Sequence, residues 1–274
     1  MSMKTILLHL TNDERLSVRI NVALNIAGEY NAHIRALYVV TPATPPTSFM
    51  GYIPPEFIER TRGIEADNAS AASAKLKEEA AKRDISVTVI KEEGYAAEVI
   101  NKHALAADIV IIGQVDPKDD STAQYLYLAD EMVIGCPCPI LAVPYAGKFE
   151  TFGSHILVGW NNTKEASRAL KGAIPFMKKA SKVTLLSVNP TVDQSHQNEA
   201  ALRHLERHGI TAEVKIGHWR NVDVGNALLD SLVDLSADML VMGAYGHSRI
   251  REMILGGATK EILGHMTAPV LFSH

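Results

Sequence analysis

Four glycines in the carboxyl-terminal part of the chain have a spacing that could bind phosphate. Gly243, Gly246, Gly256 and Gly257 follow the pattern G-x2-G-x9-G-G, and the final pair precedes a stretch that is typical of a helix. Because glycine has no Cβ, its backbone N–H groups can approach a ligand closely, and a helix start adds about half a positive charge. The pattern therefore predicts an anion cradle. The alternative is that these glycines only form turns between a strand and a helix.

The cradle needs a strand before it and a helix after it, and the surrounding sequence predicts both. Short, nearly continuous apolar runs alternate with stretches of helical length, which indicates parallel strands covered by helices on both faces. Between residues 150 and 274 the expected strands are 156–160, 183–188, 212–216, 239–242 and 270–272, and the expected helices are 164–179, 197–208, 225–235 and 259–265.

The first half of the chain repeats this pattern. Residues Ile6, Leu7, Asn12, Ser17 and Ala23 recur 150 positions later, and residues Ala107, Asp108, Gly113, Glu131 and Pro139 recur 130 positions later. The first copy has its expected strands at 5–10, 33–40, 85–91, 109–112 and 140–143, and it holds a Pro- and Thr-rich segment, 41–62, that we expect to be a long loop. The repeat predicts two α/β domains, 1–149 and 150–274, each a doubly wound, Rossmann-like sheet of five parallel strands.

Composition narrows the class of protein. Lys and Arg total 27 and Asp and Glu total 31, so the net charge of −4 gives no general attraction to nucleic acid or to anionic lipid. The chain shows no leader pattern and no apolar run of membrane-spanning length, so we expect a cytoplasmic protein without a membrane span.

The glycine segment resembles the G-x2-G-x9-G-[ST] nucleotide loop of the universal stress protein family, and the whole chain is similar to its tandem, two-domain members. The resemblance implies an adenine-nucleotide-hydrolase-like fold, with the two domains paired through their last strands as an internal pseudo-dimer. It also implies ATP, alone or with Mg²⁺, as the ligand of the second domain. The expected function is that of a nucleotide-dependent regulator in the stress response.

The resemblance also assigns the residues of this binding site. Ribose and phosphates would be held by Gly243, Gly246, Gly256, Gly257, Ala258 and Thr259, with Met242 and His247 beside them, and Val188 would line the adenine pocket. Asn161 stands where the family commonly has an acidic residue that faces the adenine. Gly257 stands where the family often has a small hydroxyl residue, so a side-chain contact is replaced by a backbone donor.

The first copy lacks the cradle. At the matching positions it has Asp116, Leu126 and Tyr127, and the acidic run that begins at Asp116 would place carboxylates where phosphates should lie. We expect this domain to be a degenerate partner that does not bind nucleotide. Its segment 11–13 is expected to be a surface loop.

Two other functions stay open. A nucleotide hydrolase could use His247 with a metal ion, although the chain has no G-x4-G-K-[ST] loop and no other motif of an efficient ATPase, so at most slow hydrolysis is expected and no catalytic residue is assigned. A protein that recruits an unknown protein partner without a nucleotide is the other alternative. Self-association into a homodimer is also left open.

Two side-chain pairs could have a chemistry of their own. His204 and His208 lie four residues apart on an expected helix and could join His196 or His218 in a zinc site, but we expect solvated surface residues and no metal. Cys136 and Cys138 are the chain's two cysteines, and their spacing fits neither a disulfide framework nor a paired zinc motif. They are expected to pack as small apolar groups, with a redox role left open.

Overall fold

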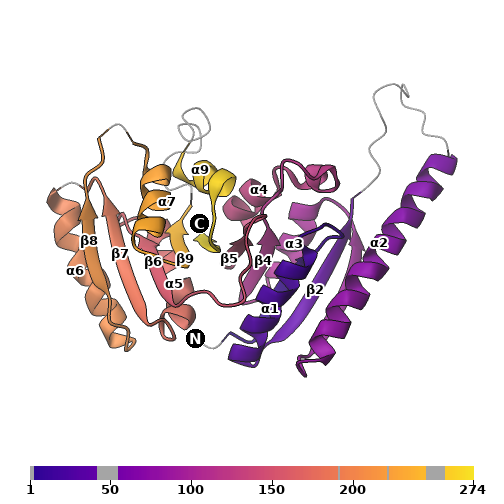
Figure 1. Ribbon diagram of the computed structural model, residues 1–274, viewed down its shortest axis with the longest axis horizontal. Coiled ribbons are helices and arrows are strands. Elements are labelled where there is room, and N and C mark those ends of the chain that lie inside the picture. The colour runs from indigo at the N-terminus through magenta and orange to yellow at the C-terminus, as the bar shows by residue number, and fades with distance from the viewer. Residues whose placement is uncertain (1–2, 42–54, 191, 221, 245–256) are drawn as a thin grey trace.

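The chain forms two successive α/β halves (Figure 1). The structure is a computed structural model that describes residues 3–41, 55–190, 192–220, 222–244 and 257–274. The first half contains β1 (Thr5–Leu10), α1 (Leu16–Tyr30), β2 (His33–Val40), α2 (Pro55–Ala81), β3 (Val87–Glu93), α3 (Ala96–Ala104), β4 (Ile109–Gly113), a 3-10 helix (Asp120–Tyr125), α4 (Leu128–Gly135) and β5 (Ile140–Val143). The second half contains β6 (His155–Gly159), α5 (Lys164–Met177), β7 (Lys182–Val188), α6 (Val192–Arg207), β8 (Glu213–Gly217), α7 (Val224–Asp234), β9 (Met239–Gly243), α9 (Ala258–His265) and β10 (Val270–Ser273).

The strands form one ten-stranded sheet in the order β3-β2-β1-β4-β5-β10-β9-β6-β7-β8. Within each half all neighbouring strands are parallel, so the predicted pair of five-stranded, doubly wound sheets is confirmed. The strand order reverses between β1 and β4 in the first half and between β6 and β9 in the second. Sheets of this kind bind ligands beyond the carboxyl ends of their strands at such switch points.

The two halves meet through their last strands, as the resemblance implies. Strand β5 pairs antiparallel with β10, and Leu141 lies opposite Leu271, its own counterpart 130 residues later. On either side of this pair, Ile140 lies opposite Phe272 and Ala142 lies opposite Val270. Equivalent residues therefore exchange partners across the joint, which is the pattern of a two-fold interface. Consequently the strands of the two halves run in opposite directions.

A side chain from the first half also crosses this joint. Gln114, directly after β4, is buried, and its Nε2 donates to the carbonyl oxygens of Leu263 at 2.8 Å and Gly264 at 3.2 Å. These carbonyls belong to the last turn of α9, where the helix itself supplies no donors. Its Oε1 accepts from the backbone N–H of Tyr145 at 3.1 Å. The amide thus ties the end of α9 to the first half.

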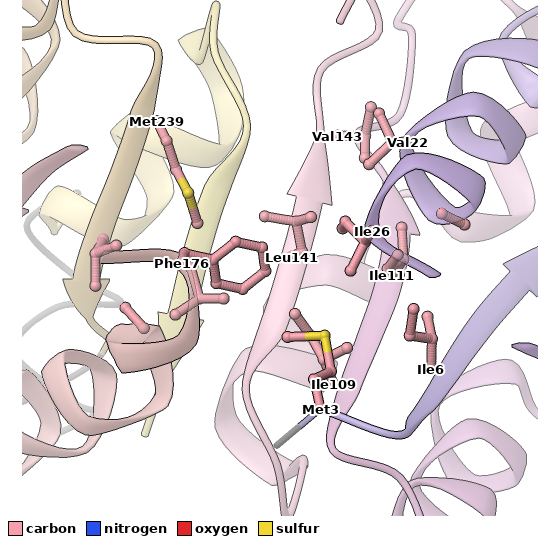
Figure 2. Close-up of a cluster of buried hydrophobic side chains, with 14 of the residues drawn as sticks. Met3, Ile6, Val22, Ile26, Ile109, Ile111, Leu141, Val143, Phe176 and Met239 are labelled. Atoms are coloured by element: carbon pink, nitrogen blue, oxygen red, sulfur yellow. The ribbon is translucent and has the colours of Figure 1, made fainter. Parts of the chain in front are cut away.

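Each face of the sheet carries a hydrophobic core that spans both halves. One cluster includes side chains of α1, α2, α5 and α6, and the other includes side chains of α3, α4, α7 and α9. The joint strands alternate between them, since Leu141 and Leu271 face the first cluster whereas Ile140 and Phe272 face the second. Figure 2 shows Phe176 of α5 beside Leu141 of β5, so apolar packing continues across the joint.

The recurring Asp108 and Asp238 have a structural role. Asp108 accepts the backbone N–H groups of Lys4 and Thr5 at 2.6 and 2.9 Å, and Asp238 accepts that of His155 at 2.9 Å, together with two of its neighbours. Both carboxylates thereby satisfy backbone donors at the amino ends of β1 and β6. This part of the repeat positions strands and not a ligand.

The structure differs from the sequence-based expectations at one long segment. Residues 41–62 were expected to be a loop, but α2 begins at Pro55. Proline is well suited to the first helical position, where its missing N–H has no partner to lose, and Glu56 adds a favourable charge in the first turn. Residues 42–54 lie outside the described part of the chain. In the part that is described, no helix is long and apolar enough to cross a membrane.

We expect Gly172→Ala to destabilise the protein by disturbing the packing between the halves. A Cβ at Gly172 in α5 would lie 2.6 Å from Cγ of Pro139, in the rigid ring just before β5. The overpacking should lower the free energy of unfolding by about 1–3 kcal/mol, even though alanine is the better helix former. Urea unfolding measures this change.

The control is Gly63→Ala in α2, where a Cβ would meet nothing within 4 Å. This substitution should leave stability unchanged or raise it by up to about 1 kcal/mol. If both variants were equally stabilised, the inferred overpacking against Pro139 would be refuted.

Candidate functional site

The switch point of the second half is built by a close approach of backbones. Gly243 ends β9, and a Cβ there would lie 2.4 Å from the backbone nitrogen of Ala166 and 2.5 Å from the carbonyl carbon of Glu165. Any side chain at this position would therefore collide with the first turn of α5. The glycine allows the carboxyl end of β9 to lie against the amino end of that helix.

The helices that begin at this edge differ in how their amino ends are capped. Thr163 caps α5, with its Oγ1 accepting from the N–H of Ala166 at 3.2 Å, and Asp223 caps α7 through the N–H of Asn226 at 3.0 Å. The N-cap residue of α9 is Gly257, which has no side chain to accept from the first turn. Of these three helix starts, that of α9 is thus the one where an external anion could take the role of a cap.

Glu165 sets the electrostatics of the neighbouring helix start. Its side chain is 3% exposed, and its carboxylate lies 3.5 Å from the ammonium of Lys164. Burial raises the pKa of Glu165, but a hydrogen bond from its own backbone N–H and the interaction with Lys164 outweigh this and hold the pKa below its ordinary value. Since α5 already has this carboxylate, its amino end is less suited to a second anion than that of α9.

Asn161, the predicted adenine contact, lies just after β6 at this edge and is exposed. Its Oδ1 accepts from the backbone N–H of Thr163 at 3.3 Å and from the hydroxyl of Thr163 at 2.9 Å. The side chain therefore shapes the turn into α5, and its amide nitrogen is the atom suited to face a ligand.

The other predicted residues fall into two groups. Val188 ends β7 and is half-buried, Ala258 and the buried Thr259 form the first turn of α9, and Met242 is buried in the core under the sheet. A ligand contact by Met242 would thus come from its backbone. Gly246, His247 and Gly256 lie outside the described residues. The assignment of all these residues to a nucleotide site stays a prediction.

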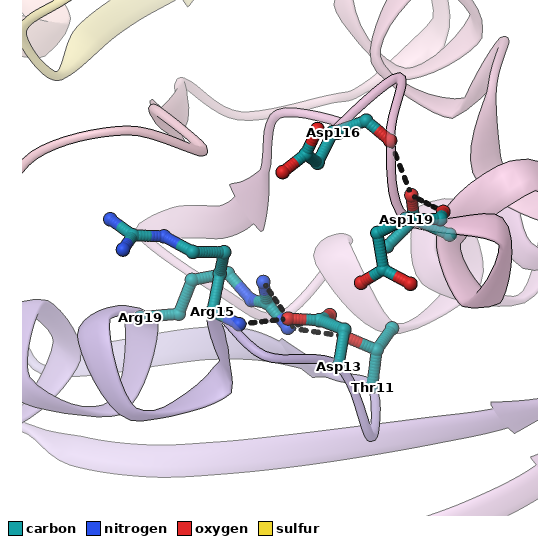
Figure 3. A network of polar contacts seen from close by, with 7 residues as sticks. Thr11, Asp13, Arg15, Arg19, Asp116 and Asp119 are labelled. Carbon is teal, nitrogen blue, oxygen red and sulfur yellow. Dashed lines mark hydrogen bonds and ion pairs between the residues drawn. The ribbon is translucent and has the colours of Figure 1, made fainter.

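The switch point of the first half is closed by an ion pair that the sequence analysis missed. Arg19 of α1 lies 2.6 Å from the carboxylate of Asp13, and both side chains are 4% exposed. The guanidinium also donates to the hydroxyl of Thr11, which in turn donates to Asp13 (Figure 3). A Cβ at Gly113 would lie 2.7 Å from Nη1 of Arg19, so the arginine packs directly against the end of β4.

Charge and burial have opposite effects on the pKa of Asp13. Burial raises the pKa of its carboxyl, but the charge and hydrogen bonds of Arg19, with hydrogen bonds from Thr11 and from the backbone of Arg15, outweigh it. The pKa of Asp13 therefore lies below its ordinary value, and the carboxylate stays charged beside the guanidinium. Segment 11–13 was expected to be a simple surface loop, but Thr11 and Asp13 belong to a buried network, whereas Asn12 is exposed.

Two rings complete this closed site. His9 and Tyr125 lie edge to face with ring centroids 5.0 Å apart, and burial with the Arg19 charge lowers the pKa of His9 to about 3. With Arg19 and Gln114 they line a cavity of about 20 Å³, which is the space of one water molecule. The site is filled by the protein's own side chains.

The acidic segment faces this network from the opposite loop. Figure 3 shows Asp116 and Asp119 across from Asp13, and Asp116 accepts the backbone N–H of Lys118 at 2.9 Å. A signal for the closed site was present in the repeat, since Arg19 stands where the second half has the buried Ala169. An arginine on an otherwise apolar helix face needs an acidic partner, and Asp13 is near in sequence.

The histidine pair on α6 has the expected spacing, and the side chain of His196, one of its candidate partners, lies outside the described part of the chain. The rings of His204 and His208 are 4.8 Å apart, edge to face, and burial lowers the pKa of His204. No group of three or more metal-ligating side chains occurs within the described ranges.

Comparison with known proteins identifies the family. The model of the universal stress protein family matches residues 3–144 and again residues 154–274, so the chain belongs to this family and has two copies of its domain. The universal stress protein Slr1230 of Synechocystis is 26% identical over 197 residues, a match that spans 68% of this chain and 64% of that relative.

Solved structures share the fold over nearly the whole chain. A universal stress protein from Archaeoglobus fulgidus is 17% identical, with a TM-score of 0.77 over 98% of this chain and 95% of that one. The functionally unknown protein PA1789 from Pseudomonas aeruginosa is 18% identical, with a TM-score of 0.63 over 99% and 92%. At such identities the likeness shows a common tandem fold.

We expect Arg19→Met to destabilise the protein strongly. Removing the guanidinium leaves the Asp13 carboxylate buried without its cation, which should lower the free energy of unfolding by about 3–5 kcal/mol. Urea unfolding at neutral pH gives the value. The double variant Asp13→Asn/Arg19→Met should lose clearly less free energy of unfolding than Arg19→Met alone. Equal losses would show that the unpaired carboxylate is not the cause of the destabilisation.

We expect His9 to make stability depend on pH. Between pH 6.5 and about 3 the unfolded chain binds a proton at this histidine and the folded chain does not, because the folded pKa is about 3. The contribution of neutral His9 to the free energy of unfolding is therefore complete above pH 6.5, and it falls by about 1.4 kcal/mol per pH unit as the pH decreases. Unfolding of wild type and His9→Phe from pH 7.5 to 5 measures the difference, and parallel curves would contradict it.

Proposed function

We propose that this universal stress protein binds an adenine nucleotide, ATP foremost, at the carboxyl edge of its second half, and that the first half does not bind one. Binding would make the protein a nucleotide-dependent regulator in the stress response. The proposal is supported by one contrast within the chain. The switch point of the first half is filled by Arg19 and its partners, whereas α9 at that of the second half begins at a glycine without a side-chain cap.

The described residues suit the separate parts of such a ligand. The first turn of α9 would donate backbone N–H groups to phosphate oxygens, and its helix dipole would favour their charge. Gly225 in α7 supports this helix closely, since a Cβ there would lie 2.7 Å from Cβ of Glu261 and 3.1 Å from the carbonyl oxygen of Ala258. Val188 would contact the adenine ring, and Asn161 would offer its amide nitrogen.

The same comparison supports the difference between the halves. A phosphate at the first switch point would have to displace a buried ion pair and approach the carboxylates of Asp13 and Asp116. Removing a guanidinium from a buried carboxylate costs several kcal/mol. One nucleotide per chain is therefore the expected stoichiometry.

We expect Gly257→Asp to weaken ATP binding without weakening the fold. Gly257 has φ −65° and ψ 161°, a conformation that any residue can adopt, and aspartate is a good N-cap. Its carboxylate would occupy the start of α9 and repel phosphate, so affinity should fall at least about tenfold, a loss of about 1.4 kcal/mol. Titration calorimetry with ATP, with and without Mg²⁺, measures affinity and stoichiometry.

A second variant at the same position separates charge from capping. Gly257→Asn has nearly the same shape without the charge and should retain more affinity than the aspartate variant. Equal affinity of the aspartate and asparagine variants would refute a phosphate at this helix start. Wild type that binds no nucleotide would refute the proposed function and favour a protein-recruiting role.

A further inference from the structure

The two cysteines lie close together at an accessible turn. Cys136 follows the last residue of α4, its Sγ lies 3.9 Å from Sγ of Cys138, and both residues are half-buried while Pro137 between them is exposed. A disulfide needs an S–S distance of about 2.05 Å, so the two sulfur atoms must approach each other further. Expected to pack as small apolar groups, they contact the core and also face one another.

The second half shows that the fold does not need this pair. At the matching positions after α9 it has Met266 and Ala268, both buried, and Met266 ends its helix as Cys136 does. The cysteines of the first half are more exposed than these counterparts. Packing alone therefore does not explain two thiols at this turn.

The surroundings distinguish the two thiols. The hydrogen bond to Cys138 holds the pKa of Cys136 below its ordinary value, and the same bond, together with burial and the charge of Asp108, raises the pKa of Cys138. With these pKa directions Cys136 ionises before Cys138, and the Cys138 thiol, 3.9 Å away, can donate to its thiolate. The reactive form of a cysteine is the thiolate, so Cys136 is the attacking group.

We propose that Cys136 and Cys138 form a redox site that is oxidised by a hydroperoxide to an intramolecular disulfide. The Cys136 thiolate attacks the peroxide, breaks its O–O bond and becomes a sulfenic acid, while the leaving oxygen takes a proton and departs as water or an alcohol. The Cys138 thiol then attacks the sulfenic sulfur, the S–S bond forms and water leaves. The two thiols lose two electrons in total and the peroxide gains them. This site is independent of the proposed nucleotide function.

The pair lies where oxidation could affect both halves. Pro139, directly after Cys138, contacts α5 at Gly172, and Ile140 pairs with Phe272 near the carboxyl end of β10. Because β9 is parallel to β10, this turn lies at the edge of the sheet where β9 also ends. A bond between the cysteines would restrict the connection that enters the joint.

The test uses the reduced full chain, treated with hydrogen peroxide after removal of the reductant. Both thiols should be lost together, the intact mass should fall by two hydrogens, and dithiothreitol should restore them. Cys138→Ser should stop at the sulfenic acid, with labelling of Cys136 by dimedone at least about tenfold above wild type. Cys136→Ser should react at least about tenfold more slowly than wild type.

The double variant Cys136→Met/Cys138→Ala copies the second half and provides a folded control without thiols. Three results would overturn the proposal. They are thiols that react with peroxide no faster than an ordinary exposed cysteine, equal dimedone labelling in wild type and Cys138→Ser, or oxidation only to disulfide-linked dimers of the chain.

Discussion

The antiparallel pairing of β5 with β10 is the interaction on which the rest of the molecule depends. Each of these four-residue strands would be an open sheet edge in a separate domain, and their pairing removes both edges and joins two hydrophobic cores on each face. Because Leu141 lies opposite its own counterpart Leu271, the halves are related as the subunits of a symmetric dimer would be. The covalent connection then fixes one partner for each half and lets their sequences diverge.

The two switch points differ in the side chains that occupy them. In the first half the long cationic side chain of Arg19 occupies the space beside Gly113 and pairs with Asp13. Polar side chains therefore fill the space beyond the carboxyl end of β4. In the second half Ala169 stands at the matching position, and Gly243 brings β9 against α5. Arg19 and its partners Thr11 and Asp13 therefore fill the first switch point, and the second half has Ala169, Asn161 and Thr163 at the matching positions.

The sequence predicted the strands, their parallel order and the pairing of the last strands. The spacing of apolar residues, the internal repeat and the family resemblance all depend on which positions are buried. It placed Asn161 and Gly243 at one edge for the same reason. It could not predict that Arg19 reaches Thr11, since that contact depends on the direction of a long side chain across a tertiary gap. It also missed the helix from Pro55, where proline opens a helix although it usually signals a loop. The domain boundary near residue 150 and the nucleotide site stay predictions.

The contact of Gln114 with α9 has a mechanical consequence. Helix α9 has eight residues, so about 12 Å separates its start at Gly257 from its end, where Gln114 of the other half supplies the missing donor. The last turn of this short helix is thus held by one half while its first turn belongs to the other, so the helix connects the two halves along its length. If the proposed ligand displaced the first turn of α9, Gln114 would carry that movement to the loop after β4 in the other half.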